Sequence, residues 1–263
     1  MPEFIEYHLD GHVAIVTLNR PETMNALNRR MYIELEQAFR DAHRDAEVRC
    51  VVLTGAGRAF CSGDDVRQIM LGEEREETVT RLREAKPKPT PAAVAILECD
   101  KPVIAAVNGA AVGWGMDLAL FADIRIASEA AKFGELFIKR GLVADLGGLW
   151  RLPRVVGPSK AAELLFTGDI ILADEAEQIG LVSRGVPADQ LMESAMTMAR
   201  KIAANPPIAL RYMKEGLRRA VHGSMAEMGE YIGNSLGYLF TTEDHTEGAL
   251  SFVERREPVF KGT

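Results

Sequence analysis

Short apolar runs alternate with amphipathic segments along the first two thirds of the chain, a pattern typical of α/β folds. The runs predict strands over residues 3–8, 12–18, 50–54, 103–107 and 124–127. The first two turn at Asp10-Gly11, a hairpin signal. A polar turn, Asn19–Asn28, then leads into an amphipathic helix. Its predicted buried face carries Met31, Leu35, Ala38 and Phe39.

The strand over 103–107 runs into a glycine-rich turn over 108–115, which becomes the start of a helix extending to about Phe121. N–H groups around Trp114 would lie at the positive end of that helix, where they favour developing negative charge. Asp117 follows one turn later. A tight strand-to-helix connection with an exposed acid explains the same residues without a function.

A second unit of this kind follows the strand over 50–54, where the chain reads GAGRAFCSGDDVRQIM. Gly63 frees the backbone, and Asp64 is predicted to begin a helix through about Leu71. Two helix starts could direct two N–H donors at one oxygen. GAGRAF is not a dinucleotide fingerprint, because Phe60 stands where the third glycine is needed.

The last third of the chain changes from mixed α/β to helical patterns. Residues 72–91 are rich in charge and proline and predict an exposed, mobile segment. Helices are expected over 92–98 and 157–169, then over 194–207 and 208–221 around a Pro-Pro break, and in the tail to Phe252. We therefore divide the chain into a core, 1–200, and a helical region, 201–263.

Composition narrows the class of protein. The chain has 263 residues, of which 47% are hydrophobic, and a net charge of -7, which argues against nucleic acid as a partner. No basic leader and no membrane-spanning apolar run is apparent, so a cytoplasmic location is expected. The cysteines, Cys50, Cys61 and Cys99, lack the spacing of a zinc site or a disulfide framework and predict buried free thiols.

Three ordered segments, GAGRAFCSGDDV, KPVIAAVNGAAVGWGMDLALFADIRIA and FGELFIKRGLVADLGGLWRLPRVVG, resemble the signatures of the crotonase superfamily, the enoyl-CoA hydratase/isomerase family. The resemblance covers nearly the whole chain, from NRPETMNAL to the final FKG. It implies an α/β fold, a superhelix of ββα turns with a C-terminal helical trimerisation region. Homotrimers, commonly paired as hexamers, are the implied assemblies.

The resemblance also implies an acyl-CoA thioester substrate, with coenzyme A as part of the substrate and no separate cofactor or metal. The backbone N–H groups of Asp64 and Trp114 match the family's two oxyanion donors. The CoA moiety would contact two segments of this chain and two cationic side chains. These are Met24, Ala26 and Leu27; Ala59, Cys61 and Asp65; Arg58; and Lys261 from a neighbouring subunit. Arg58 and Lys261 are equally explained as exposed cations.

The acids distinguish the possible reactions. Hydratases of this family use two glutamates, and Asp117 and Phe137 stand at those positions here. Phe137 cannot transfer a proton, and Glu135 is two residues away from the motif position. Asp145 matches the aspartate of dienoyl-CoA isomerases and of ring-opening isomerases of phenylacetate degradation. A helix N-cap before Gly147-Gly148 is the alternative role for Asp145.

Three hypotheses follow from the resemblance. An enoyl-CoA isomerase would move a proton with Asp145 while Asp117 assists. A hydratase or dehydratase for an unusual acyl group would divide the acid and base roles between these two aspartates. A non-catalytic acyl-CoA-binding protein would keep the fold and lack turnover. A serine hydrolase is less well supported, because Ser62 lies in FCSGD rather than in GxSxG.

Overall fold

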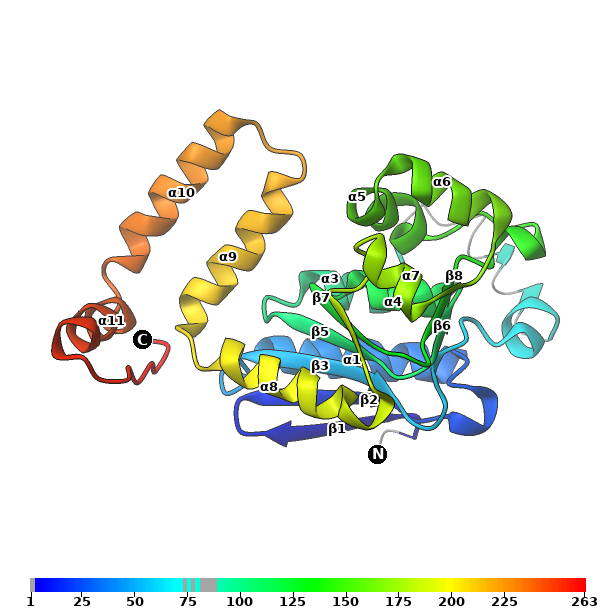
Figure 1. Ribbon diagram of the computed structural model, residues 1–263, viewed down its shortest axis with the longest axis horizontal. Coiled ribbons are helices and arrows are strands. Elements are labelled where there is room, and N and C mark those ends of the chain that lie inside the picture. The colour runs from blue at the N-terminus through cyan, green and yellow to red at the C-terminus, as the bar shows by residue number, and fades with distance from the viewer. Residues whose placement is uncertain (1–2, 73–74, 77–78, 81–88) are drawn as a thin grey trace.

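The computed structural model describes residues 3–72, 75–76, 79–80 and 89–263. Two sheets form its centre (Figure 1). The larger contains, in spatial order, β1 (Ile5–Asp10), β2 (Val13–Leu18), β3 (Cys50–Gly55), β5 (Val103–Val107), β7 (Ile124–Ser128) and β10 (Arg184–Val186). The smaller contains β4 (Ala59–Cys61), β6 (Ala110–Val112), β8 (Lys132–Gly134) and β9 (Ile171–Leu172).

The chain winds between the two sheets. The strand pairs β3/β4, β5/β6 and β7/β8 each place their first strand in the larger sheet and their second in the smaller one. The pairings among these strands are parallel, whereas β1 and β2 form the expected antiparallel hairpin. This winding confirms the predicted superhelix of strand, strand and helix units.

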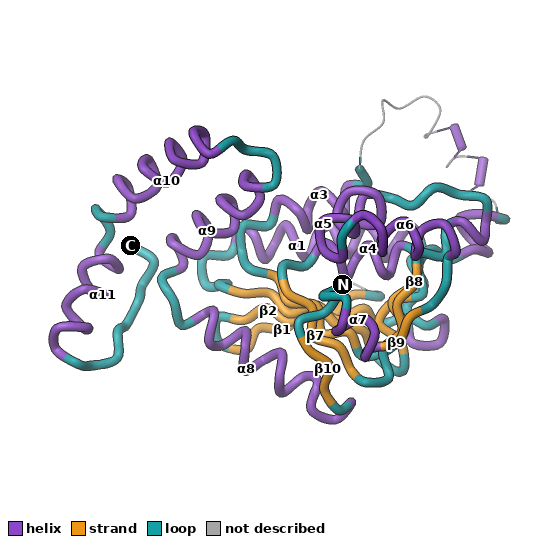
Figure 2. The backbone as a smooth tube through the Cα atoms, turned by 45° about the horizontal axis from the view of Figure 1, so that its top comes forward, coloured by secondary structure: helices purple, strands orange, loops and turns teal. Residues whose placement is uncertain are grey.

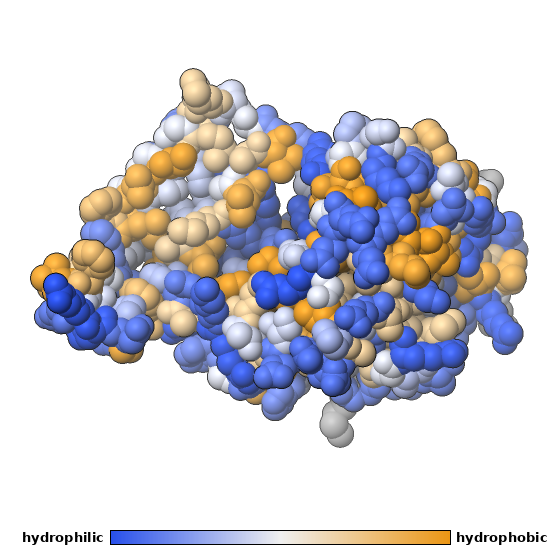
Figure 3. Space-filling model, in the orientation of Figure 1, coloured by the Kyte–Doolittle hydropathy of each residue, from blue (hydrophilic) through white to orange (hydrophobic). Residues whose placement is uncertain are grey.

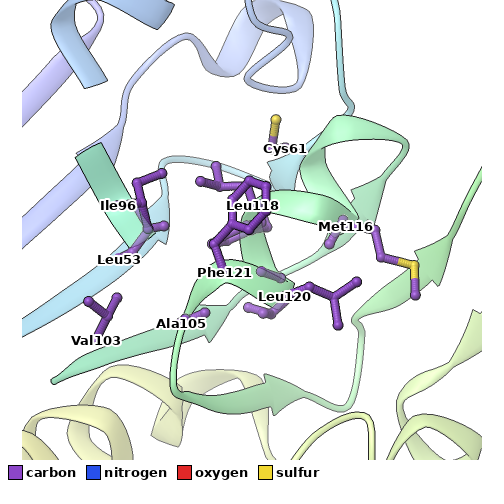
Figure 4. Packing of buried hydrophobic residues seen from close by; sticks show 14 of the residues in the cluster. Leu53, Cys61, Ile96, Val103, Ala105, Met116, Leu118, Leu120 and Phe121 are labelled. Carbon is purple, nitrogen blue, oxygen red and sulfur yellow. The ribbon is translucent and has the colours of Figure 1, made fainter. Parts of the chain in front are cut away.

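Helices cover both faces of the larger sheet (Figure 2). The helices are α1 (Arg29–Arg44), α3 (Pro91–Glu98), α4 (Trp114–Phe121), α5 (Leu152–Val156), α6 (Pro158–Thr167), α7 (Ala173–Gln178), α8 (Leu191–Ala203), α9 (Pro207–Ala220), α10 (Met225–Leu239) and α11 (Glu243–Glu254). One face of the sheet packs against α8 and the other against α1, α3 and α4. On the face covered by α1, α3 and α4, Leu118 and Phe121 of α4 lie among Leu53, Ile96 and Val103 (Figure 4). Helix α4 is buried on all sides because its eight residues are almost entirely apolar.

The long predicted elements agree with the structure. Met31, Leu35, Ala38 and Phe39 are buried on α1, and all three cysteines are free and buried. The three-residue strands β4, β6 and β8 were not predicted, and β6 and β8 replace expected turn or irregular structure. They are too short to give an alternating pattern. Most of the predicted mobile segment, 72–91, lies outside the described residues.

The C-terminal helices extend away from the sheets. Helices α9 and α10 lie side by side, and α11 follows beside the C-terminus, on the far side of the molecule from β6 and β8 (Figures 1 and 2). Apolar side chains are visible along α9 and α10 (Figure 3). Exposed apolar residues on the three helices include Met213, Leu217, Met225, Ile232, Leu236, Phe252 and Val253.

Candidate active site

The two backbone segments that carry the predicted N–H donors, Asp64 and Trp114, lie next to each other. Asp64 forms a parallel bridge with Leu27, and the adjacent N–H of Leu27 donates to the carbonyl of Gly63 over 2.8 Å. Gly63 has a φ of +85°, and a Cβ added there would lie 3.3 Å from the Trp114 nitrogen. Glycine therefore allows the segment that carries Asp64 to pack directly against the start of α4.

The local structure at Asp64 differs from the prediction. A five-residue π-helix covers Val66–Met70, and Asp65 caps it by accepting from the N–H groups of Arg67 and Gln68. Asp64 thus lies before the cap and does not begin the helix. Its side chain forms no helix cap, and the isolated bridge to Leu27 holds its backbone instead.

Trp114 is the first residue of α4, as predicted. Gly113 precedes it with a φ of 54°, and the N–H of Gly113 donates to the carbonyl of Gly134 over 2.8 Å. Among the described residues, no protein acceptor takes the N–H of Asp64 or that of Trp114. Both donors are therefore available to a ligand.

These two segments line a small pocket of about 20 Å³. Gly63, Asp64 and Trp114 form one side of its lining, and Phe137 and Arg140 contribute from the chain that follows β8. Phe137 thus brings an aromatic ring to the pocket at the sequence position where a hydratase of this class would carry its second glutamate.

Asp145 is held by two N–H donors. The indole Nε1 of Trp114 donates to Oδ2 over 3.1 Å, and the backbone N–H of Leu146 donates to Oδ1 over 2.7 Å. The carbonyl of Asp145 also accepts from the N–H of Leu149, at the start of the π-helix Gly147–Arg151. Leu146 occupies the N-cap position of this helix and no side chain caps it, which corrects the capping alternative for Asp145. The carboxyl group of Asp145 instead contacts the side chain of a predicted oxyanion residue.

Asp117 is fully buried, with 0% of its surface exposed, which corrects the alternative of an exposed acid. Burial raises its pKa well above the usual range, and the charges of Glu135 and Asp145 raise it further. Glu135 is 1% exposed. Burial raises its pKa to about 8, although a hydrogen bond with the Asp117 side chain partly offsets that rise.

Tyr32 forms a further polar contact near the pocket. Its hydroxyl donates to Oδ1 of Asp64 over 2.6 Å, and its ring packs edge-on against Trp114 with centroids 4.8 Å apart. Burial raises the pKa of Asp64, and the hydrogen bond from Tyr32 opposes that rise. The sequence prediction missed Tyr32 because it lies on α1, far along the chain from either glycine-rich segment.

The two segments predicted to line the CoA site lie together. The N–H of Ser62 donates to the carbonyl of Met24, and that of Asp65 donates to the carbonyl of Leu27, over 3.0 and 2.8 Å. Arg20 joins the same region through a 2.8 Å ion pair with Asp65. Ala26, Ala59 and Cys61 are buried, and Ala59 and Cys61 present almost no surface to a ligand within this subunit.

The two predicted phosphate partners are separated within this chain. Arg58 and Lys261 are both exposed. Lys261 lies in the C-terminal tail, where its N–H donates to Asp244 over 2.7 Å. Figure 1 places the C-terminus beside α11, on the side of the molecule opposite β6. A single subunit therefore does not bring these two cations together, and Lys261 can serve such a site only in a neighbouring subunit.

The described residues contain neither a metal cluster nor a membrane-spanning helix. No group of three or more His, Cys, Asp or Glu side chains in the described ranges has the geometry of a metal site. Among these same residues, no helix has the length and apolar character needed to cross a membrane.

Comparison with known proteins identifies the family. The family model for enoyl-CoA hydratase/isomerase matches residues 9–263. The chain belongs to the enoyl-CoA hydratase/isomerase family. An enzyme of the hydratase or isomerase type was expected, and this membership confirms the expectation.

Relatives in the enoyl-CoA hydratase/isomerase family carry names of both reaction types. The chain is 39% identical over 266 residues to (E)-benzylidenesuccinyl-CoA hydratase of Thauera aromatica, covering 100% of both chains. It is 34% identical over 267 residues to 1,2-epoxyphenylacetyl-CoA isomerase of Escherichia coli, again over 100% of both. The crystal structure of enoyl-CoA hydratase from Bacillus anthracis matches with a TM-score of 0.91 and 34% identity, covering 99% of this chain and 100% of that one.

Proposed function

We propose that the protein is an enoyl-CoA isomerase that shifts a carbon-carbon double bond in an acyl-CoA thioester, with Asp145 as the proton carrier. The backbone N–H groups of Asp64 and Trp114 would receive the thioester oxygen. The relation between Trp114 and Asp145 carries this proposal. One residue supplies an unoccupied N–H donor from its backbone and holds the candidate base with its side chain.

The reaction requires one proton to leave C2 and one to arrive at C4. Asp145 takes the C2 proton, and the electrons of that C–H bond move onto the thioester oxygen to give a dienolate. The two N–H groups stabilise the oxygen charge, each well-placed donor contributing about 3 to 4 kcal/mol. Return of the proton from Asp145 to C4 leaves the double bond between C2 and C3 and restores the carboxylate.

Phe137 supports isomerisation over hydration. Two-glutamate hydration needs a second carboxyl group to hold the attacking water, and the pocket carries an aromatic ring from that position. An apolar wall also disfavours an ordered water beside the substrate. Asp145 remains as an acid whose carboxyl group is oriented by two donors.

Hydration or dehydration of an unusual acyl group is the second candidate. The 39% identity to a hydratase of Thauera aromatica favours it, as does the buried acid Asp117. In that case Asp117 and Asp145 would divide the acid and base roles. The coenzyme A part would bind along residues 24–27 and 58–65 in either case.

We also propose that residues 201–263 form an oligomerisation region, in a homotrimer or a pair of trimers. Large apolar side chains are exposed on these helices, including Met225 at 92% and Phe252 at 85%. Contiguous apolar surface of this kind is typical of subunit interfaces. A neighbouring subunit is also what could bring Lys261 toward the acyl-CoA. Sedimentation of the full chain and of Phe252→Glu tests this region.

Replacement of Asp145 tests the proposed reaction. Asp145→Asn keeps an acceptor for the Trp114 indole and removes the base, so 3-enoyl-CoA isomerisation should fall by at least about a hundredfold. Acyl-CoA affinity, measured by calorimetry, should remain. Asp169→Asn is the matched control, since Asp169 is an exposed aspartate beside α6. Unchanged turnover in Asp145→Asn would contradict the assignment.

A further inference from the structure

We propose that the carboxyl groups of Asp117 and Glu135 share a single proton in the resting protein. Glu135 is thereby a positioning residue that limits this pair to one negative charge beside the oxyanion donors. The charge-sharing rests on the burial of the two groups and on their lack of other donors, and it does not depend on the reaction. Its effect on turnover rests on the proposed isomerase function.

Neither carboxyl group has another hydrogen bond of good geometry. Among the described residues, no N–H or hydroxyl donor reaches an oxygen of Asp117 or Glu135 at a hydrogen-bonding distance and angle. The two side chains are 0% and 1% exposed, so water does not replace those donors at the surface. A buried carboxylate without donors is strongly disfavoured. A proton on one group satisfies both, since its O–H donates to the other carboxylate.

Two glycines close the space around the pair. A Cβ added at Gly147 would overlap Asp117, and one added at Gly148 would lie 3.1 Å from Oε2 of Glu135. These glycines begin the π-helix that follows Asp145. The backbone of this helix therefore packs directly on both acids. It leaves no room beside them for another side chain.

The neighbouring charges also favour a shared proton. The charge of Asp145 raises the pKa of both Asp117 and Glu135, and the charge of Asp64 raises the pKa of Asp117. Asp145 and Asp64 therefore oppose further negative charge on the pair. The backbone N–H of Gly148 lowers the pKa of Asp117, but by less than burial raises it. Arg140 acts on Asp64 and lowers its pKa. Two ionised carboxylates buried near each other are the least favourable state here.

The pair lies one helical turn from the N–H of Trp114, where the enolate charge would form. The N–H of Asp117 itself donates to the carbonyl of Gly113 over 3.1 Å. A second charge on the pair would repel the enolate as well as Asp145. Turnover should therefore decrease when the pair loses its proton, near the pKa of about 8 that burial gives Glu135.

Two isosteric variants limit the pair to one titratable group. Glu135→Gln leaves only Asp117 able to ionise, and Asp117→Asn leaves only Glu135 able to ionise, so each variant carries at most one charge at any pH. Glu129→Gln is the matched control, because Glu129 is an exposed glutamate at the end of β7. The melting temperature and, separately, kcat for a 3-enoyl-CoA are measured for all four proteins between pH 5 and 9.5.

The sign of the stability effect is fixed by linkage. The folded pKa of Glu135 is raised above the unfolded value of 4.5, so between those values the folded protein binds more protons than the unfolded chain. Wild-type stability should therefore fall as pH rises through this window and level off above it. In each pair variant one carboxyl group no longer titrates, so the fall in stability over this window should be smaller than in the wild type, whereas Glu129→Gln should match the wild type. At pH 9, wild-type kcat should be about tenfold below its pH 7 value, while each pair variant, which never carries two charges, should lose a smaller fraction of its own pH 7 rate.

Infrared difference spectroscopy of the wild type provides a measurement that needs neither turnover nor a variant. A protonated-carboxyl band should persist at pH 7 and disappear above pH 8. Absence of that band at pH 7, or the same pH dependence of the melting temperature in Glu135→Gln as in the wild type, would overturn the shared proton. If isomerisation itself is not found, the band and the melting temperatures still decide the question.

Discussion

The indole of Trp114 donates a hydrogen bond to Asp145 over 3.1 Å, and the backbone N–H of the same tryptophan is the first free donor of helix α4. The tryptophan thus links a predicted oxyanion donor to a predicted base. Tyr32 packs against its ring and donates to Asp64, the residue that carries the other predicted donor. Side chains of α1 and α4 therefore fix the relative positions of the two segments that carry Asp64 and Asp145.

Trp114→Phe should reduce kcat by about tenfold with little change in KM. The variant keeps the backbone N–H and an aromatic ring against Tyr32, and it removes only the donor to Asp145. A hydrogen bond to a charged group contributes about 1.5 to 3 kcal/mol, and the base would lose part of its orientation. Steady-state kinetics with a 3-enoyl-CoA measures both parameters.

Trp150→Phe provides the control for loss of an indole donor. Trp150 is the only other tryptophan, and its Nε1 donates to His222 of the loop after α9 over 3.3 Å. This variant should keep the wild-type kcat. Equal rates in Trp114→Phe and the wild type would mean that the indole does not position Asp145.

Tyr32→Phe should destabilise the fold by about 1 to 3 kcal/mol at pH 7, because it leaves the partly buried carboxyl group of Asp64 without its hydroxyl donor. The pKa of Asp64 should rise further for the same reason. Urea unfolding measures the stability. Tyr7→Phe is the control, since the hydroxyl of Tyr7 makes no hydrogen bond within the described part of the chain. Equal losses in the two variants would argue against the Tyr32–Asp64 bond.

Gly147→Ala should destabilise the protein by about 1 to 3 kcal/mol, because the new methyl group would overlap Asp117 in a tightly packed region. Gly229→Ala is the opposite case. A Cβ at that position in α10 meets no atom within 4 Å, and alanine favours a helix over glycine. Thermal unfolding should show a lower melting temperature for Gly147→Ala and an unchanged or higher one for Gly229→Ala. A neutral Gly147→Ala would mean that the acids are not confined as described.

The sequence pattern predicted the elements that are long or strongly periodic. The hairpin β1–β2 follows from Asp10-Gly11 and two apolar runs, and the buried face of α1 follows from its helical spacing. The smaller sheet could not be predicted from local pattern. Its strands have two or three residues, and pairing between β4, β6 and β8 depends on the winding of the whole chain.

The candidate site was predicted where motif spacing fixed it and missed where tertiary packing did. Asp64 and Trp114 lie on adjacent segments, as two glycine-rich turns suggested. Glu135 was set aside because it is off the motif, yet it is buried against Asp117. A lone acid within the apolar run around β8 was the available signal. The contact between Trp114 and Asp145 joins residues 31 positions apart, and no local pattern encodes it.

The most direct test of the proposed isomerase is to incubate the wild-type protein with 3-hexenoyl-CoA and, separately, crotonyl-CoA in deuterated water. NMR and mass spectrometry then follow each thioester. We predict conversion of 3-hexenoyl-CoA to the conjugated 2-isomer, with little hydration of crotonyl-CoA. Rapid hydration of crotonyl-CoA without isomerisation of 3-hexenoyl-CoA would contradict the isomerase and favour the hydratase. Binding of both thioesters without reaction of either would contradict proton transfer by Asp145 on simple enoyl chains.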